Sequence, residues 1–252
     1  ERDTLRHVVM LALRYISDII IVDDGSSDRM IETIVDLPVT IYQNSERIGK
    51  AGSLWKGIQA GLGRNADFIL TMDGDGQHRA EDIPAMMKLS QENPRCIVMG
   101  SRLENVAAAP KLRRFGNLVA DVFLSWACGQ RIIDSQSGFR VYPRSLFSET
   151  NIPVDLNRGF VFESEILIDG ATLGYGSVSL SIPMIYSEGA RPSHFRPVVD
   201  TYRITMMITL NLISRLAYPV GFYRAFLRPT IQRISRLQRA HLIPLSASFL
   251  IV

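Results

Sequence analysis

Cysteine is scarce in this sequence of 252 residues, and long apolar runs are missing from it. Its two cysteines, Cys96 and Cys128, both lie within apolar stretches, which favours two reduced, buried thiols over a disulfide. No stretch reaches the roughly 18–20 uninterrupted apolar residues that a membrane-spanning helix needs. The apolar residues 242–252 are too few for a span, although they could be the start of one that is cut off. No signal peptide and no internal repeat is found.

Acidic residues almost disappear toward the end of the sequence. Residues 200–252 contain seven arginines and a single acid, whereas residues 1–199 carry a net charge of −3. A nearly neutral body with a basic tail argues against a nucleic-acid-binding protein and indicates an anionic surface as the partner of the tail. Because apolar residues are interleaved with these arginines, we expect amphipathic helices in a membrane interface rather than a solvated basic helix.

Short apolar runs alternate with helical patterns over the first hundred residues. We predict strands at 18–24, 39–42, 68–72 and 96–100, and helices at 27–35, 51–62 and 81–91. Further on, the patterns predict helices at 112–126, 160–173 and 204–216, and strands within 132–142 and 177–186. Alternation with short connections is typical of a parallel sheet covered on both faces. We therefore expect an α/β fold with a doubly wound, mostly parallel sheet flanked by helices, followed by C-terminal amphipathic helices.

Residues 71–78, TMDGDGQH, follow a predicted strand and bring together two carboxylates and an amide, those of Asp73, Asp75 and Gln77. Such oxygen donors are ligands of hard cations, so the stretch predicts a site for Mg²⁺ or Mn²⁺. An EF-hand loop starting at Asp73 would need Gly at its sixth position and Glu at its twelfth, and neither is present. Zinc is disfavoured because only His78 is near. The alternative for an isolated D-x-D is a polar turn stabilised by Asx bonding.

Several further motifs accompany this stretch in a fixed order, and they are VDDGSSD (22–28), N-x-x-x-x-G-K (44–50), GSR (100–102), RRFGN (113–117) and DSQSGFR (134–140). The set resembles the family 2 glycosyltransferases with a GT-A fold, in particular the branch that acts on dolichyl and polyprenyl phosphates. The resemblance covers residues 1 to about 200. Members of the family open with a strand that ends in a nucleotide-touching segment, so the resemblance implies that this first strand is missing here.

The resemblance implies a role for each matching position. The residues that would bind the nucleotide-sugar donor are Asp23, Asp24, Gly49, Lys50 and Asp73. The residues that would hold a divalent metal on its pyrophosphate are Asp73, Asp75 and Gln77. The residues that would face the acceptor or its phosphate are Arg102, Arg113, Arg114, Ser193 and Arg196. The residues expected to be catalytic are Asp75, Asp134 and Arg140.

The implied reaction is transfer of a hexose, with inversion, from a nucleoside diphosphate sugar to a polyprenyl phosphate. A cation and guanidinium groups would stabilise the charge that develops on the leaving pyrophosphate. A phosphate acceptor is already anionic near neutral pH, whereas a sugar hydroxyl would need a carboxylate base within about 3 Å, for which Asp134 or Glu163 is the candidate. Two alternatives stay open: transfer to a sugar or glycolipid hydroxyl, and a non-catalytic nucleotide-sugar-binding protein.

The expected organisation is a transferase domain at 1–196 followed by a basic, membrane-associated segment at 197–252. This arrangement predicts a peripheral protein at the cytoplasmic face of a membrane, or one anchored by a C-terminal span that is cut off. A phosphatase of the D-x-D-G-T kind is disfavoured because Gln77 stands where Thr would be needed. A processive polysaccharide synthase is disfavoured because no Q-x-x-R-W stretch is present.

Overall fold

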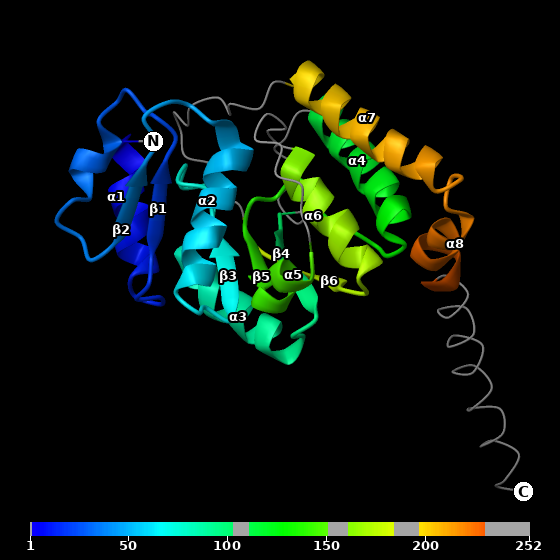
Figure 1. Cartoon of the computed structure of the whole chain (residues 1–252), viewed down its shortest axis with the longest axis horizontal. Helices are drawn as coiled ribbons and strands as arrows, with labels where there is room; N and C mark the ends of the chain where they lie inside the picture. The colour runs from blue at the N-terminus through cyan, green and yellow to red at the C-terminus, as the bar shows by residue number, and fades with distance from the viewer. Residues whose placement is uncertain (1, 103–110, 151–160, 184–196, 230–252) are drawn as a thin grey trace, which may run out of the picture.

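The computed structural model of the chain describes residues 2–102, 111–150, 161–183 and 197–229 (Figure 1). The α-helices are α1 (Arg2–Ala12), α2 (Gly49–Gly63), α3 (Ile83–Glu92), α4 (Lys111–Cys128), α5 (Arg144–Glu149), α6 (Val161–Thr172), α7 (Pro197–Ser214) and α8 (Pro219–Phe222). The strands are β1 (Ile20–Asp23), β2 (Thr40–Gln43), β3 (Phe68–Thr71), β4 (Cys96–Ser101), β5 (Arg140–Pro143) and β6 (Gly176–Ser181). Short 3₁₀ turns occur at η1 (Met30–Thr33) and η2 (Ala80–Asp82), and a π-helical turn at Tyr223–Leu227 continues α8.

The described strands form two sheets. One pairs β1 with β2 in parallel, and the other has the order β3-β5-β4-β6. Because β5 runs antiparallel to both of its neighbours, the sheet is mixed, and the prediction of a mostly parallel sheet is wrong. After α4 the chain returns along residues 129–139 and enters the sheet beside the end of β3, where Arg140 lies opposite Thr71. The connection therefore delivers the loop before β5 to the edge at which β3 and β4 end.

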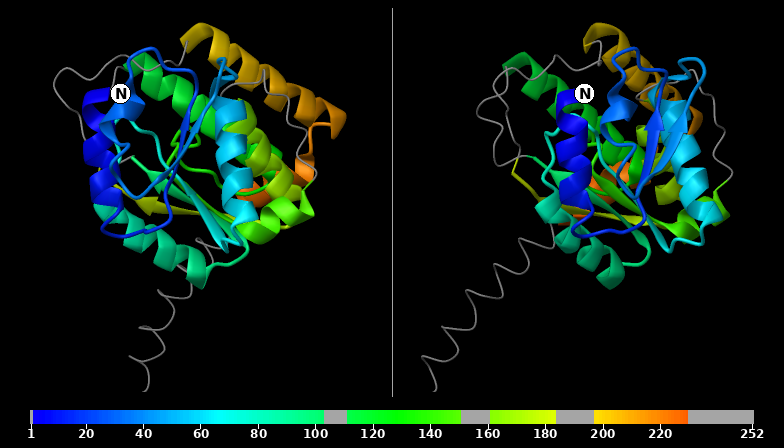
Figure 2. Two further views of the ribbon diagram at one scale, coloured as in Figure 1. Left: turned by 60° about the vertical axis from the view of Figure 1, so that its left-hand side comes forward. Right: turned by 90° about the vertical axis from the view of Figure 1, so that its left-hand side faces the viewer.

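Helices cover both faces of the four-stranded sheet, and the side chains of β4 show this directly. Ile97 and Met99 lie in a cluster with apolar residues of α4, α6 and α7, whereas Val98 lies in another cluster with residues of α3. This alternation follows from the two-residue period of a strand. Figures 1 and 2 show α7 lying beside α4 on one side of the molecule. The predicted α/β fold with flanking helices is confirmed.

The outer edges of β1 and β3 carry no strand partner in the described residues. α2 packs against both strands. Most residues of β1 and β3 are only half-buried, whereas all four residues of β5 are buried.

Most predicted helices and strands lie within a few residues of the observed ones. The helix expected at 27–35 is instead the single 3₁₀ turn η1, preceded by Arg29 in the left-handed region at φ 54°. Ile34 is buried as expected, but Val35 is exposed. Cys96 and Cys128 are free thiols as predicted, but only Cys128 is buried, and Cys96 is half-buried. Burial raises the pKa of Cys128 to about 12. No helix in the ranges given above is both long and apolar enough to cross a bilayer.

Candidate active site

The predicted polar clusters converge at one edge of the molecule. β1 ends at Asp23, β3 is followed by Asp73, and β4 is followed by Arg102. The loop before β5 reaches the same edge because Arg140 starts its strand where β3 finishes. Glu163 joins the cluster from the first turn of α6. Ligands of open α/β sheets bind beyond such strand ends.

Asp23 and Asp24 organise the first part of this edge. The carboxylate of Asp23 is buried and accepts hydrogen bonds from the Ser26 N–H at 3.0 Å and from Gln43 Nε2 at 3.1 Å. Asp24 accepts from the backbone N–H groups of Ile48 at 2.8 Å and Gly49 at 2.9 Å. An anion at this position satisfies free N–H groups at the start of α2 and interacts favourably with the helix dipole.

Lys50 lies between two carboxylates that come from distant parts of the chain. Its Nζ is 3.3 Å from Asp73 Oδ1 and 3.3 Å from Glu163 Oε2. Burial alone would lower the pKa of Lys50, but the two negative charges outweigh it and raise the pKa. Burial would likewise raise the pKa of Asp73, and the charge of Lys50 lowers it instead. Lys50 therefore ties the end of β3 to the start of α6.

The stretch after β3 holds the predicted metal ligands. Asp75 Oδ1 accepts the backbone N–H of Gln77 at 3.0 Å, which is the Asx bonding named above as the alternative to a metal site. The neighbouring His78 is buried, and its Nδ1 makes no hydrogen bond within the described ranges. Burial lowers the pKa of His78.

The donor chemistry of these residues fits a hard cation. Within the described ranges, no group of three or more His, Cys, Asp or Glu side chains could hold a metal ion. The predicted set has two carboxylates and one amide, those of Asp73, Asp75 and Gln77, so it does not require such a group. Mg²⁺ is commonly held by one or two carboxylates and completes its coordination with substrate phosphates and water.

Gly138 allows the loop before β5 to approach Asp73 closely. A Cβ atom at Gly138 would lie 2.5 Å from Asp73 Oδ2, which is shorter than any tolerated contact. Thr71 also donates from its hydroxyl to the Gly138 carbonyl at 2.9 Å. Gly138 therefore matters through the space it leaves for a carboxylate, and not only as the backbone turn that its sequence context indicates.

Arg102 and Asp134 form a bidentate ion pair across the site. Arg102 donates from Nε to Asp134 Oδ2 at 2.8 Å and from Nη2 to Oδ1 at 2.8 Å, and its backbone N–H donates to Oδ2 at 2.9 Å. Both side chains are largely buried. Burial would raise the pKa of Asp134, but the hydrogen bond and charge of Arg102 lower it. Asp134 is consequently a weak base in this arrangement.

Arg140 is fully buried beneath the loop that carries Asp134. Its guanidinium donates to the carbonyls of Ser135 at 2.6 Å, Ser137 at 2.8 Å and Glu163 at 2.8 Å. These contacts hold the loop and the first turn of α6 together. The predicted catalytic role of Arg140 stays a prediction, and the contacts that the side chain makes are with the chain itself.

The structure thus brings together Asp73, Lys50 and Glu163 in one group, and Arg102 and Asp134 in another. Charge effects between Arg102 and Asp73 show that the two groups are neighbours. The helix α4 includes Arg113 and Arg114, but the structure does not describe their side chains. Ser193 and Arg196 lie outside the described residues.

Two residues of the site were given no role in the sequence predictions. Buried Asn44 contacts Asp24, Ser53 and Lys56, and it belongs to a motif whose Gly and Lys alone were assigned a function. Asp121 binds the loop of Asp134, and its signal was visible as the single acid of the apolar stretch 111–128.

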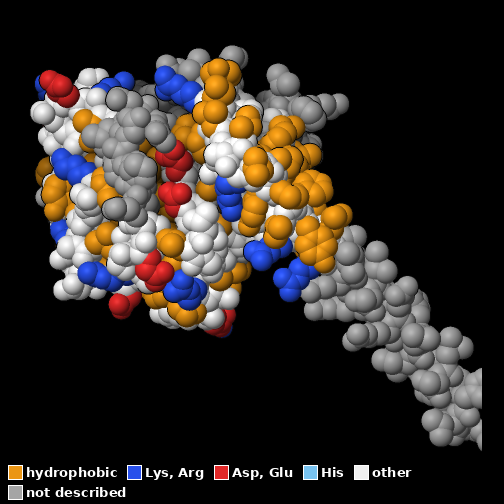
Figure 3. All heavy atoms as spheres, turned by 45° about the vertical axis from the view of Figure 1, so that its right-hand side comes forward, with side chains coloured by type: hydrophobic (Ala, Val, Ile, Leu, Met, Phe, Trp, Pro, Cys, Tyr) orange, Lys and Arg blue, Asp and Glu red, His pale blue; other side chains and the backbone are white. Residues whose placement is uncertain are grey.

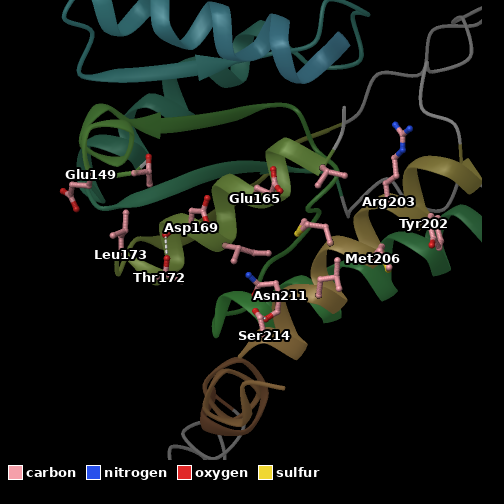
Figure 4. A pocket seen from close by; sticks show the side chains of 15 residues that line it. Glu149, Glu165, Asp169, Thr172, Leu173, Tyr202, Arg203, Met206, Asn211 and Ser214 are labelled. Atoms are coloured by element: carbon pink, nitrogen blue, oxygen red, sulfur yellow. Dashed lines mark hydrogen bonds between the residues drawn. The ribbon is translucent and has the colours of Figure 1, made fainter. Parts of the chain in front are cut away.

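A cavity of about 920 Å³ lies elsewhere, between α6 and α7. Figure 4 shows Glu165 and Asp169 on one wall and Tyr202 and Met206 on the other. None of the predicted site residues lines it. Because the chemistry-bearing groups lie around Lys50 and Arg102, we place the candidate site at the strand ends rather than in this cavity.

Curated relatives share moderate identity with much of the chain. The UDP-N-acetylglucosamine–dolichyl-phosphate N-acetylglucosaminyltransferase of Methanococcus voltae is 28% identical over 148 residues, 51% of this chain and 59% of that protein. The undecaprenyl-phosphate mannosyltransferase of Micrococcus luteus is 24% identical over 180 residues, 68% of this chain and 73% of that protein.

Among solved structures, glucosyl-3-phosphoglycerate synthase from Mycobacterium tuberculosis, in complex with Mn²⁺, UDP-glucose and glycerol 3-phosphate, matches with a TM-score of 0.57. The match has 16% identity and covers 85% of this chain and 76% of that one, so it shows a GT-A-like α/β fold. Residues 1–151 match the family described as Glycosyl transferase family 2. With its fold, its ordered motifs and its polar strand ends, the chain belongs to glycosyl transferase family 2 and is a glycosyltransferase.

Proposed function

We propose that this glycosyltransferase moves a hexose, with inversion, from a nucleoside diphosphate sugar to a polyprenyl phosphate at a membrane surface. The observation that carries the proposal is that both candidate bases are held in ion pairs. Asp134 is bound by Arg102, and Glu163 is bound by Lys50. An acceptor phosphate needs no such base because it is already anionic near neutral pH. The printed activities of the Methanococcus and Micrococcus relatives support the same acceptor class.

The donor would bind at the edge formed by Asp23, Asp24 and the start of α2. Asp24 already fixes the N–H groups of Ile48 and Gly49, so this turn is rigid before a ligand arrives. Lys50 follows at once and places a cation beside Asp73. A leaving pyrophosphate would therefore develop its charge next to fixed positive groups, which stabilises a transition state most when those groups need not reorganise.

A divalent cation would be held by Asp73, Asp75 and Gln77. When bound, it would neutralise charge on the departing nucleoside diphosphate as a Lewis acid. The chain itself contributes the orientation of these ligands, because Asp75 accepts the Gln77 N–H and Asp73 packs against Gly138. The Mn²⁺ in the structure of the Mycobacterium synthase supports this cation class.

The side chains on one side of the molecule support the proposal that it binds a membrane surface. Exposed apolar side chains follow α7 and continue into α8, and they are Tyr202, Met206, Leu210, Ile213, Leu216, Val220, Phe222, Tyr223 and Leu227. Figure 3 shows hydrophobic side chains gathered there, with basic ones close by. Arg215, Arg224 and Arg228 belong to the same segments. Apolar side chains rimmed by arginines suit the boundary of a bilayer with anionic lipids.

The test incubates membranes that contain the chain with radiolabelled nucleotide sugars, with and without Mn²⁺. The measured quantity is the label that is transferred to extracted lipid. We expect metal-dependent label in a lipid that mild acid releases, as a sugar bound to a polyprenyl phosphate would be. An acid-stable labelled glycolipid would instead establish the hydroxyl acceptor. Donor binding with no transfer at all would leave a nucleotide-sugar-binding protein and contradict the proposal.

Asp75→Ala tests the cation within the same assay. We expect metal-dependent transfer to be abolished, since one of two carboxylate ligands is lost. The matched control is Asp67→Ala, which removes an exposed carboxylate just before the other end of β3. Unchanged turnover and unchanged Mn²⁺ dependence in the Asp75 variant would remove this residue from the metal site.

A further inference from the structure

Asp121 is the one acidic residue of α4. Its Oδ2 accepts the backbone N–H of Asp134 at 3.0 Å, and its Oδ1 accepts that of Ser135 at 2.8 Å. Burial raises the pKa of Asp121, and the nearby charge of Asp134 acts in the same direction. Within the described ranges no cation lies within ion-pair distance of Asp121, so hydrogen bonds from the loop are what stabilise its charge.

The loop of residues 134–137 is held from two sides. Asp121 of α4 accepts hydrogen bonds from two backbone N–H groups of the loop. Arg140 of β5 donates hydrogen bonds to the loop carbonyls of Ser135 and Ser137. A short loop bound by a carboxylate on one side and a guanidinium on the other has little freedom to shift.

The backbone of Asp134 is strained within this loop, which Asp121 and Arg140 hold from two sides. Its φ is 53°, in the left-handed region that residues with a Cβ rarely occupy. Such a conformation persists only where the surroundings impose it. In this conformation the Asp134 carboxylate points toward Arg102 and accepts hydrogen bonds from three of its N–H groups.

We infer that Asp121 is a positioning residue that sets the Arg102 guanidinium at the strand ends by imposing the strained conformation of Asp134. The inference rests on the proposed function and on the role that the family resemblance gives Arg102, which is to face the acceptor or its phosphate. Asp121 itself touches neither substrate nor cation. Its effect passes through two backbone N–H groups to Asp134, and from Asp134 to Arg102.

The contact can be tested without activity, by hydrogen exchange of the amides of Asp134 and Ser135. Asp121→Ala removes both acceptors, and we expect these two amides to exchange at least about tenfold faster, the factor for a loss of 1.4 kcal/mol. Asp121→Asn keeps only one of the two acceptor oxygens and places an NH₂ donor where the other was, so it should keep the protection of one amide and lose that of the other. Asp169→Ala, which removes a partly buried carboxylate of α6, is the control and should leave both amides unchanged.

Transfer kinetics then separate positioning from general stability. A misplacement of about 1 Å can cost on the order of 100-fold in turnover, so we expect Asp121→Ala to lower kcat strongly while KM for the nucleotide sugar changes little. Asp121→Asn, which keeps one of the two acceptors, should have a kcat between those of Asp121→Ala and the wild type. If Asp121 acts through Arg102, the double variant Asp121→Ala, Arg102→Ala should lose no more than Arg102→Ala alone.

Additive losses in the double variant, or normal amide protection and normal kcat in Asp121→Ala, would overturn the inference. Should the alanine variant fail to fold, the asparagine variant decides, because normal protection of both amides together with normal kcat would contradict a role that depends on two acceptor oxygens. Inactive wild-type protein would count against the proposed function instead, and the amide protection would still decide whether Asp121 fixes the loop.

Discussion

Lys50 joins two distant parts of the candidate site through its charge. It lies 3.3 Å from carboxylates that are 90 residues apart in the sequence, those of Asp73 and Glu163. Removal of the lysine would leave two like charges in a place where water reaches only part of their surface. Residue-level predictions about this site therefore concern the balance of charge as much as contacts with substrate.

Replacement of Lys50 by Met should destabilise the protein by about 1–3 kcal/mol near neutral pH, less than for a fully buried pair because Lys50 and Asp73 are about a third exposed. The folded pKa of Asp73 lies below its ordinary value of 3.8, so its stabilisation is present above that value and is lost as pH falls through the folded pKa. The deficit of the variant should consequently shrink below about pH 4. Urea unfolding at several pH values measures it.

The control for this experiment is Lys88→Met, which removes an exposed lysine that lies 3.9 Å from Glu92 on α3. Surface pairs of this kind contribute little, so its stability should stay within about 0.5 kcal/mol of the wild type. A Lys50 variant that loses no stability, or that loses the same amount at every pH, would show that the two carboxylates do not depend on the lysine.

Gly138→Ala should reduce transfer on the order of 100-fold, because the added Cβ would displace the Asp73 carboxylate from which it would lie 2.5 Å. Gly63→Ala is the matched control, since its Cβ would meet nothing within 4 Å. That variant should keep full activity and gain up to about 1 kcal/mol of stability. Steady-state transfer together with thermal unfolding distinguishes the two. Equal activity in both variants would mean that Asp73 tolerates movement.

At the scale of elements, α2 begins where Asp24 accepts the N–H groups of Ile48 and Gly49. Asp24→Ala should cost about 1–2 kcal/mol, as the loss of a helix N-cap does. Asp24→Asn keeps one of the two acceptor oxygens but loses the other and the charge that interacts favourably with the helix dipole, so it should cost less than Asp24→Ala. Urea denaturation ranks the variants. If the two cost the same, hydrogen bonding at this helix start contributes nothing beyond charge.

The sequence predicted elements well wherever local pattern decides them. The strand at 68–72 and the helix at 51–62 were found within two residues, because apolar periodicity and flanking glycines act locally. The direction of β5 was not predictable in this way. It depends on where residues 129–139 carry the chain after α4, and this is a matter of tertiary packing. The turn η1 was not predicted either, because the helical pattern does not show that the backbone of Arg29 is left-handed, which limits the helix to one 3₁₀ turn.

At the scale of the whole molecule, the candidate site depends on segments that only the fold brings together. The motifs placed these acids at strand ends, as the structure does, so the metal and donor residues could be proposed from sequence, and their roles stay predictions. The pairing of Arg102 with Asp134 could not, since 32 residues separate them and no pattern links them. The same holds for the contact between Asp121 and the loop of Asp134. It consists of hydrogen bonds from backbone N–H groups, which only the fold brings to Asp121.

The surface formed by α7 and α8 gives the prediction that concerns the molecule as a whole. Leu210→Glu should weaken binding of the full chain to vesicles that contain anionic lipid by about tenfold or more, because burial of a leucine contributes about 1.5–3 kcal/mol. Arg215, Arg224 and Arg228 should make the binding fall with added salt, since screening weakens their attraction to anionic headgroups. Sedimentation with sucrose-loaded vesicles measures both effects. Met10→Glu, at a comparably exposed position on α1, is the control and should bind like the wild type. Equal losses in the two variants would indicate general damage, and undiminished binding of the Leu210 variant would place the membrane contact elsewhere on the chain.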